Sequence, residues 1–367
     1  MNPREEPTVL PLAVPSAKPS LRFAPAKRHL ILIPFLSVIV SCTSGGVSQT
    51  KPGQVMASIR AGLGPGTVSV NSPYAWVPDT REGKVSQVDV RSNRVVRTVR
   101  IGDAAAFYQR DCAAYGSVHS FMVTTFHVRD CDLPSALAAT AQATWVLGND
   151  DHTVVRLDPK DGREITRVPL AMRPWGIAAD ARAVWATSYL DDVVVKVDPQ
   201  SNRPVGRIAV PGGPTNVALG LGGAWVVSSR SNSVSLIDPS SNRVVKTVAI
   251  PCPTACPFGP TPLAIAIAAG SVWVRNERDS TLSRIDPERG QVTATYPVDA
   301  FYGRDGLDAM ALADGAIWLG GVQLQRFDLR TATVRRIDLS ATTVADGAGS
   351  LWVTDIAGTL LRLETGR

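Results

Sequence analysis

The 367-residue chain is poor in aromatic residues, which make up 6% of it, and it has four histidines. Its 30 glycines and 27 prolines supply many turn-forming positions. This balance favours many short strands joined by tight turns over a helical protein. The sequence contains no Ser-His-Asp order, no P-loop and no nucleotide-binding glycine fingerprint. The sequence therefore gives no support for catalysis by a Ser-His-Asp triad or for catalysis that uses a bound nucleotide.

The chain also lacks a strong charge of one sign. Its net charge is +6, but residues 1–41 hold five of the 38 basic and two of the 32 acidic residues, which leaves +3 for the remainder. Nucleic-acid binding usually needs basic residues clustered on one face. We therefore expect no nucleic-acid partner.

The apolar run near the N-terminus is short. Residues 30–40 form a run of 11, too few to span a bilayer, and the basic residues Lys27 and Arg28 precede it. A basic flank, a short apolar stretch and a small residue such as Ser41 are typical of a secretory signal. The sequence predicts a signal peptide at residues 1–41.

The residues that end this segment, Ile39-Val40-Ser41-Cys42, resemble the lipobox of bacterial lipoproteins. The resemblance implies that Cys42 is lipid-modified and that the chain is anchored to a bacterial membrane, on its periplasmic side or at the cell surface. Residues 42–52 are small and polar, as in a flexible tether. An ordinary signal peptide or an uncleaved anchor, with an incidental cysteine, is the alternative.

Four further cysteines would then lie where disulfides persist. Each nearest-neighbour pair falls within one connection, so we predict the disulfides Cys112–Cys131 and Cys252–Cys256. The other two connectivities remain open. Metal binding by the second pair is the weaker reading, because no further cysteine pair or nearby histidine completes a tetrahedral site.

A tryptophan-centred phrase recurs along the chain, with successive tryptophans 69, 40, 40, 48, 45 and 34 residues apart. The seven copies centre on Trp76, Trp145, Trp185, Trp225, Trp273, Trp318 and Trp352. In the third copy, residues 175–180, 183–189, 193–199 and 204–210 read as four strands. A period near 40 with four short strands is typical of a β-propeller blade. The sequence predicts an all-β, seven-bladed β-propeller of four-stranded antiparallel blades over residues 53–367.

The seventh copy is incomplete, because it stops after its third strand. Residues Gln54 to Ala61 match the missing outer strand. We expect them to pair beside Leu360 to Leu363, so that an N-terminal strand completes the last blade and leaves no open edge. The tryptophans should fill the core, and the recurring acid of each turn should be structural.

Two phrases carry a resemblance to a known family: "GGAWVVSSRSNSVSLIDPSSNRVVKTVAIP" and "DGAGSLWVTDIAGTLLRLE". They resemble seven-bladed propellers with YVTN-type repeats, a group that includes YncE-like and virginiamycin B lyase-like proteins, and the likeness covers about residues 51–367. The resemblance implies a lyase with a histidine base and Mg²⁺ in the later blades. No histidine occurs from Thr153 onward, so that base has no counterpart there.

Residues that break the repeat are the candidates for function, on the face where the D–A and B–C connections meet. Trp175 lies outside the tryptophan register beside Arg173, and Tyr189 ends a nearby strand. Trp175 either plugs the entrance of the central channel or stacks on a ligand. We assign all three residues to a ligand or partner face.

Later in the chain, Arg275, Tyr302 and Arg304 lie in connections of the same face. Aromatic and arginine residues together favour recognition of a partner or an anionic ligand. The alternative is a solvated rim with internal ion pairs.

Residues 102–134 form an insertion that we read as an extra hairpin closed by the first predicted disulfide. His119 and His127 lie on one side of a strand in it, too far apart to share an ion unless the strand folds back. Asp150, Asp151 and His152 could bind a divalent ion, but a polar turn is the preferred reading, so no metal site is predicted.

These observations favour an extracytoplasmic, lipid-anchored, monomeric propeller that acts as a non-catalytic binding scaffold. Its ligand would be a protein, a glycan or a small anionic molecule, bound without a cofactor. The alternative is a metal-assisted lyase or hydrolase in which His119, His127 or His152 serves as base.

Overall fold

The computed structural model describes residues 51–62, 66–79, 82–102, 136–148, 152–252, 259–299, 310–355 and 357–366. Its contacts divide the chain into two units, Met1–Ser48 and Gln49–Arg367. The first unit lies outside the described residues, so the signal peptide and the lipidation of Cys42 stay predictions. Within the described ranges, no helix is long and apolar enough to cross a membrane.

The described part of the second unit contains only strands, turns and loops, in seven separate four-stranded sheets. Blade 1 comprises β2 (Ser69–Asn71), β3 (Tyr74–Asp79), β4 (Lys84–Asp89) and β5 (Arg94–Arg100); blade 2 comprises β6 (Leu137–Ala139), β7 (Thr144–Gly148), β8 (Thr153–Leu157) and β9 (Glu164–Pro169). Blade 3 comprises β10 (Ile177–Ala179), β11 (Val184–Ser188), β12 (Val193–Asp198) and β13 (Arg203–Ala209); blade 4 comprises β14 (Pro214–Gly220), β15 (Gly223–Ser228), β16 (Ser233–Asp238) and β17 (Arg243–Ala249).

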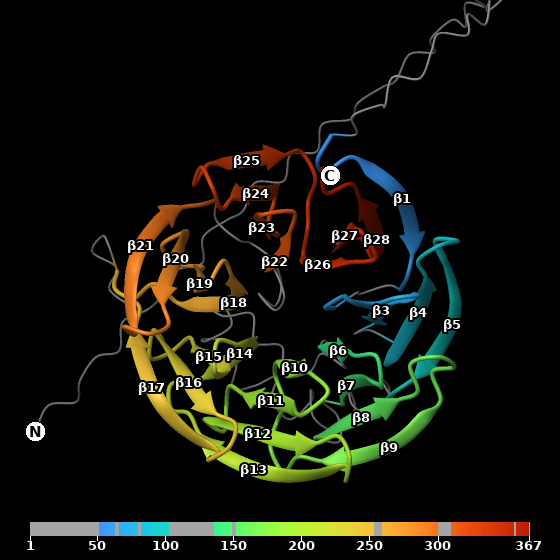
Figure 1. The fold of residues 1–367 in the computed structure, drawn as a ribbon. Coiled ribbons are helices and arrows are strands. Elements are labelled where there is room, and N and C mark those ends of the chain that lie inside the picture. Colours follow the sequence, from blue (N-terminus) through green and yellow to red (C-terminus); the bar gives the residue numbers. More distant parts are fainter. Residues whose placement is uncertain are drawn as a thin grey trace, which may run out of the picture. The chain divides into compact units, whose positions relative to one another are not determined.

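The later blades follow the same order, with one exception in the last. Blade 5 comprises β18 (Pro262–Ala268), β19 (Ser271–Asn276), β20 (Thr281–Asp286) and β21 (Gln291–Pro297); blade 6 comprises β22 (Met310–Ala313), β23 (Ala316–Leu319), β24 (Leu324–Asp328) and β25 (Val334–Ile337). Blade 7 comprises β26 (Thr343–Gly347), β27 (Ser350–Thr354), β28 (Thr359–Leu363) and β1 (Val55–Arg60). Figure 1 shows the blades arranged as a ring, each with its first strand innermost. The predicted seven-bladed β-propeller is confirmed.

The ring is closed by the N-terminal strand of the described unit. β1 pairs antiparallel with β28, with Ile59 opposite Leu360 and Val55 opposite Leu363. Two backbone hydrogen bonds extend the pairing, from the Gly53 nitrogen to the Glu364 oxygen (2.7 Å) and from the Glu364 nitrogen to the Gln54 oxygen (2.9 Å). The predicted closure is therefore confirmed. It leaves blade 7 with its full complement of strands, as in the other blades.

The seven repeated tryptophans fill the core, each at most 3% exposed. In several blades a long polar side chain of the third strand lies over the tryptophan ring and donates a hydrogen bond to the turn of the next blade. Arg156 lies 5.2 Å from the ring centroid of Trp145 and donates to the Pro199 oxygen at 2.8 Å. Lys196 does the same over Trp185, donating to the next blade's turn carbonyl at 2.7 Å. We call this contact the inter-blade latch.

In blades 1 to 6, the recurring acid closes the turn between the third and fourth strands. In blade 4, the Asp238 carboxylate accepts hydrogen bonds from the Ser240 nitrogen (2.9 Å) and from the hydroxyl of Ser241 (2.8 Å). The hydrogen bond from the Ser240 backbone, followed by those from the two hydroxyls, lowers the pKa of Asp238 to about 2. Asn242 then takes a left-handed conformation with φ of 54°, as the turn requires. The acids are structural.

Candidate functional site

The connections of the ring fall on two faces, because neighbouring strands run antiparallel. The connections between blades, and those between the second and third strands of a blade, lie on one face, which we call the loop-rich face. The connections between first and second strands and between third and fourth strands lie on the opposite face, which we call the hairpin face. Trp175 and Tyr189 lie in connections of the loop-rich face, as the sequence predicts, whereas Arg275 lies within β19 and not in a connection.

Two of the predicted aromatic residues meet on the loop-rich face beside an arginine that the sequence did not single out. The ring centroids of Trp175 and Tyr189 lie 5.6 Å apart at an interplanar angle of 38°. The guanidinium carbon of Arg230 lies 5.0 Å from the Tyr189 centroid. Trp175 precedes β10, Tyr189 follows β11 and Arg230 follows β15, so the group joins blades 3 and 4. We call these three residues the Trp175 cluster.

Arg230 is held over the ring of Tyr189 by Asp192. The Asp192 carboxylate accepts a hydrogen bond from Arg230 Nη2 and forms an ion pair with it. The same oxygen also accepts from the backbone nitrogens of Gly212 (3.1 Å) and Gly213 (2.8 Å). Burial alone would raise the pKa of Asp192, but the hydrogen bonds from Gly213 and Arg230 hold it below its usual value. Asp192 is therefore ionised at neutral pH and keeps Arg230 in place.

A second aspartate fixes the segment that carries Trp175. Asp191 accepts hydrogen bonds from the Arg173 nitrogen (2.9 Å) and from the Ser188 hydroxyl (2.6 Å). Burial opposes ionisation of Asp191, yet these hydrogen bonds and the charge of Arg173 lower its pKa. The Trp175 backbone nitrogen donates to the Thr187 oxygen at 2.7 Å. Arg173 thus lies beside the cluster, as the sequence predicts.

The close approach of Tyr189 to the chain depends on Gly213. This glycine has a φ of +71°, and a Cβ built on it would lie 2.7 Å from the Tyr189 ring. Any other residue would strain the backbone and displace the ring. Gly213 therefore lets Tyr189 lie across the connection between blades 3 and 4.

Trp175 is half-buried, and its ring packs against the core between blades 2 and 3. Its indole nitrogen is buried and has no hydrogen-bond partner among the described residues. Tyr189 is also half-buried, and Arg230 is exposed. The cluster is thus anchored on its inner side and offers aromatic and cationic surface on its outer side. Whether it binds a ligand stays a prediction.

Arg275, another predicted site residue, is 3% exposed. Its guanidinium donates to the Gly320 oxygen and, at 3.1 Å, to the Asp299 oxygen, which ties blade 5 to blade 6. Burial lowers the pKa of Arg275 to about 10. The side chain occupies the place from which the Thr187 hydroxyl donates to the Thr215 oxygen, at 2.8 Å, in blade 3. Its position is that of a buried tie between blades rather than of a solvated rim.

The structure describes only some of the remaining predicted site residues. Tyr302 and Arg304, the first predicted disulfide Cys112–Cys131 and the histidines His119 and His127 lie outside the described residues. Cys252 is disulfide-bonded, but its predicted partner Cys256 also lies outside them, so the pairing stays a prediction. His152 is exposed on the loop-rich face. Within the described ranges, no three His, Cys, Asp or Glu side chains lie close enough together to hold a metal ion.

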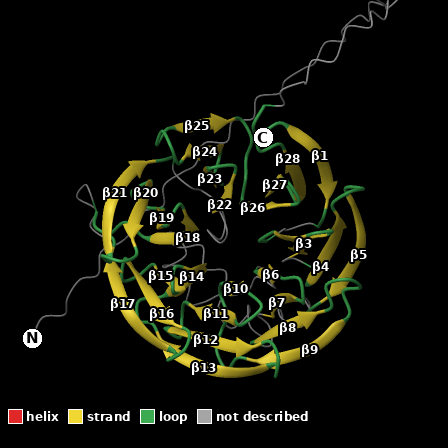
Figure 2. Ribbon diagram, viewed as in Figure 1, coloured by secondary structure: helices red, strands yellow, loops and turns green. Residues whose placement is uncertain are grey.

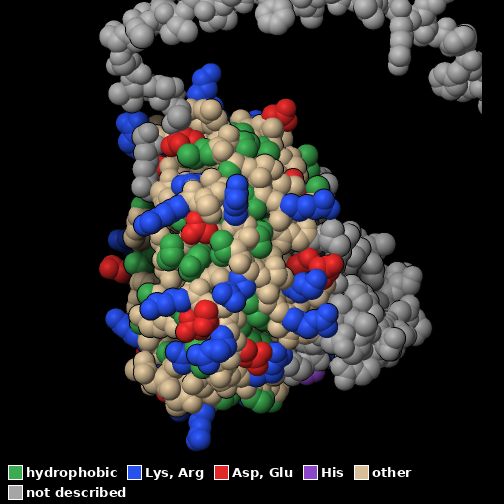
Figure 3. All heavy atoms as spheres, turned by 90° about the vertical axis from the view of Figure 1, so that its right-hand side faces the viewer, with side chains coloured by type: hydrophobic (Ala, Val, Ile, Leu, Met, Phe, Trp, Pro, Cys, Tyr) green, Lys and Arg blue, Asp and Glu red, His purple; other side chains and the backbone are tan. Residues whose placement is uncertain are grey.

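On the side of the ring that carries β1 and β5, side chains of both charges are mixed (Figure 3). Figure 3 shows the side of the ring that carries β1 and β5, where Lys and Arg side chains lie among Asp and Glu side chains and exposed apolar ones. Val96 and Met56 are among the exposed apolar residues of these two strands. A sequence-independent nucleic-acid interface usually presents a basic stripe. The view of this side offers none.

Comparisons with known proteins concern the fold. No protein-family model matches the chain, and no curated protein matches it. A streptogramin B lyase structure is 16% identical, with a TM-score of 0.64 over 86% of this chain and 96% of the other. Hydrazine synthase of Kuenenia stuttgartiensis is 14% identical, with a TM-score of 0.62 over 88% of this chain and 99% of the other.

A third solved structure, the β-propeller domain of Cps50 (Swd1) from Myceliophteria thermophila, is 12% identical, with a TM-score of 0.64 over 85% of this chain and 99% of the other. These identities are too low to carry function from one protein to another. The names YVTN-type and YncE-like stay predictions. What the comparisons show is the fold: the chain is a seven-bladed β-propeller similar to that of streptogramin B lyase.

Proposed function

We propose that this protein is an extracytoplasmic, lipid-anchored binding scaffold that recognises its ligand without catalysis, through the Trp175 cluster on the loop-rich face. The observation that carries the proposal is the geometry of that cluster. Two half-buried aromatic rings lie 5.6 Å apart, and an arginine lies over the outer ring. Tryptophan, tyrosine and arginine are the residue types that dominate binding energy at interfaces.

The cluster is held in place before any ligand arrives. Arg230 is held by Asp192, and the loop of Trp175 is held by Asp191 and by Thr187. Side chains that are already ordered lose little conformational entropy on binding, so more of their contact energy appears as affinity. A ligand with a flat or apolar surface fits such rings, and an anionic group on it would meet Arg230. The ligand is a protein, a glycan or a small anionic molecule that meets this description.

The N-terminal sequence supports the location. The basic flank, the largely apolar residues 30–40 and the lipobox-like ending at Cys42 suit export followed by lipid attachment. Labelling cells with radioactive palmitate tests the anchor: the label should enter the wild type and not the Cys42→Ser variant. An unlabelled wild type would contradict the anchor but not the binding site.

Co-purification from intact cells, followed by mass spectrometry, tests the binding. The wild type is compared with Trp175→Ala and Arg230→Gln, and Arg335→Gln serves as control because it removes an exposed charge from blade 6, far along the chain from the cluster. We expect one ligand to be retained by the wild type and the control and lost by both cluster variants. Equal recovery with all four proteins would overturn the proposal.

The alternative function is a metal-assisted lyase or hydrolase, favoured by the likeness in fold to a streptogramin B lyase. His152 is the described histidine on the loop-rich face that could act as its base. A thermal shift with Mg²⁺ or Ca²⁺ tests this reading. An increase in melting temperature that His152→Ala abolishes would favour the enzyme over the scaffold.

A further inference from the structure

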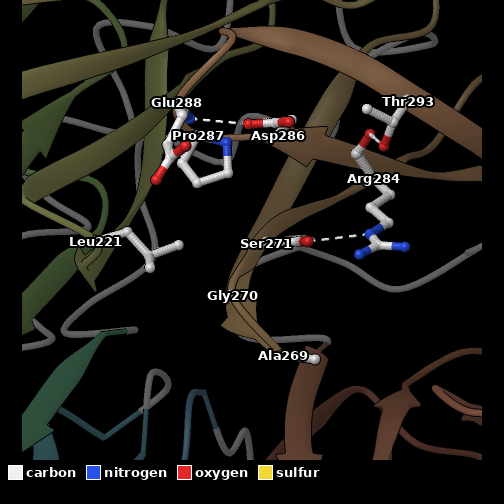
Figure 4. A pocket seen from close by; sticks show the side chains of 9 residues that line it. All are labelled: Leu221, Ala269, Gly270, Ser271, Arg284, Asp286, Pro287, Glu288 and Thr293. Atoms are coloured by element: carbon white, nitrogen blue, oxygen red, sulfur yellow. Dashed lines mark hydrogen bonds between the residues drawn. The ribbon is translucent and has the colours of Figure 1, made fainter.

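A hollow of about 660 Å³ lies on the hairpin face, at the end of blade 5. Figure 4 shows it between the turn that joins β18 to β19 and the turn that joins β20 to β21. Leu221, from the corresponding hairpin of blade 4, forms part of its wall. Pockets that bind small molecules in proteins commonly have volumes of about 300–1,000 Å³. This hollow lies on the face opposite to the Trp175 cluster and has the size of a ligand site.

Among the described residues, four cations lie over a tryptophan ring, and the hollow contains the one of these four that does not form the inter-blade latch. Arg156, Lys196 and Arg362 each lie over a tryptophan and donate to a backbone oxygen of the next blade. Arg284 occupies the same place in blade 5, with its guanidinium carbon 5.8 Å from the ring centroid of Trp273. Because Arg284 shares its position in the repeat with these three residues, we expect it to form an inter-blade latch to blade 6.

Arg284 instead turns within its own blade. Its Nε donates to the Ser271 hydroxyl at 2.9 Å, and the side chain is exposed. Among the described residues, its two Nη atoms make no hydrogen bond and no ion pair. The two Nη atoms of an arginine form a planar fork that matches the two oxygens of a carboxylate. Arg284 therefore offers the hollow an unused site for a carboxylate.

The opposite side of the hollow carries a carboxylate of its own. The turn that holds Glu288 is fixed by Lys246 of blade 4, whose Nζ donates to the Pro287 oxygen (2.6 Å) and to the Glu288 oxygen (2.7 Å). The Glu288 side chain is exposed and makes no hydrogen bond or ion pair within the described ranges. The neighbouring Asp286 is different, because it already accepts from backbone nitrogens and pairs with Arg289. Glu288 is thus the carboxylate available to a ligand.

Apolar surface separates the two charges. Figure 4 shows Arg284 and Glu288 on opposite sides of the hollow, with Leu221 and Ala269 along its wall. Leu221 is 38% exposed, although leucine is usually buried. A Cβ built on Gly270 would meet no atom within 4 Å, so there is open space at this point of the lining. A bound molecule would meet a cation at one end, an anion at the other and an apolar surface between them.

We propose that this hollow binds a short zwitterionic peptide. Its terminal carboxylate would pair with the Nη atoms of Arg284, its ammonium group with Glu288, and an apolar side chain would contact Leu221. The inference goes beyond the proposed function, because the site lies on the other face and shares no residue with the Trp175 cluster.

Isothermal titration of the purified full-length chain with alanyl-leucine tests the proposal. We expect saturable binding at one site with a Kd of about 1 mM or tighter. Alanyl-leucine amide and N-acetyl-alanyl-leucine each lack one of the two charges, and each should bind about tenfold more weakly or worse. This comparison of ligands uses the wild type alone, so it does not depend on the folding of a variant. Absence of saturable binding, or equal binding of all three peptides, would overturn the proposal.

Variants assign each charge to its residue. Arg284→Gln should abolish the preference for the free acid over the amide, and Glu288→Gln should abolish the preference for the free amine over the acetylated peptide. The controls Arg335→Gln and Asp338→Asn remove exposed charges from blade 6 and its following loop, and should bind as the wild type does. Trp175→Ala should also bind alanyl-leucine normally, which separates this site from the proposed function. A preference that survives Arg284→Gln, or that is lost with Trp175→Ala, would contradict the assignment.

Discussion

Replacing Arg275 by methionine removes the buried tie between blades 5 and 6 while keeping an unbranched apolar side chain. The change deletes the hydrogen bonds to the Gly320 and Asp299 oxygens. Hydrogen bonds from a charged donor contribute about 1.5–3 kcal/mol each, so the two together contribute about 3–6 kcal/mol. The change should therefore weaken the contact between the two blades.

Burial of the charge offsets part of this contribution. The pKa of Arg275 falls from its usual value to about 10 because the guanidinium is removed from water. Each pKa unit corresponds to about 1.4 kcal/mol, so burial costs about 3 kcal/mol at neutral pH. The methionine does not carry that cost, but it leaves two carbonyl oxygens without their donor. We expect the free energy of unfolding to fall by about 2 kcal/mol.

Urea unfolding at neutral pH, followed by far-ultraviolet circular dichroism, measures this loss as a lower midpoint at an unchanged m-value. Arg336→Met is the matched control. It breaks an exposed ion pair with the carboxylate of the same Asp299, at 2.6 and 2.7 Å, and should change the free energy of unfolding by less than about 1 kcal/mol. Equal losses for the two variants, or an Arg275→Met protein as stable as the wild type, would refute the reasoning.

Two other predictions concern the closure of the ring and its turns. Ile59→Ala should lower the free energy of unfolding by about 2–4 kcal/mol, because Ile59 is 5% exposed in the core between blades 7 and 1. Met56→Ala on the same strand, 52% exposed, should change it by less than about 0.5 kcal/mol in urea unfolding, and similar effects of both would argue against docking of β1. Asp238 has a folded pKa of about 2, below its unfolded value, so its stabilising contribution is present above about pH 4 and is lost as the pH falls through about 2. Urea unfolding between pH 4 and 2 should therefore show a shallower decline for Asp238→Asn than for the wild type, and an identical decline would contradict this origin of acid sensitivity.

The sequence predicts the ring because its main signal is local. Each blade repeats a tryptophan, and in the first five blades a turn acid follows it by 13 residues, so the repeat itself indicates seven sheets. The closure by β1 is also readable, because the last copy lacks one strand and residues 54–61 supply its pattern. Trp175 is found by the same logic, since it departs from the register.

Contacts between blades are much harder to read from the sequence. Arg275 looks like an exposed loop residue until the Gly320 oxygen, 45 residues away, is placed beside it. Arg230 gains its role from Asp192 in the preceding blade, and no local pattern links these two positions. A charged residue in the loop after β15 is a weak signal by itself.

The sequence does not reveal the hollow at Arg284 either, because its features also depend on contacts between blades. In the sequence, Arg284 is one more member of a recurring cationic position, alongside Arg156 and Arg362. Its unused Nη atoms become visible only when the neighbouring blade is in place and the latch is seen to be missing. The repeat predicts which residues share a position, but the packing of two blades determines whether each finds its partner.

Hydroxyl-radical footprinting in intact cells, read by mass spectrometry, tests most directly whether the Trp175 cluster is a recognition surface. The account predicts that Trp175 and Tyr189 are oxidised less in cells than in the purified protein, because a ligand covers them there. Met56, exposed on the outer strand β1, should be oxidised equally in both. Equal oxidation of Tyr189 in cells and in purified protein would contradict the proposal that the loop-rich face of the ring binds a ligand.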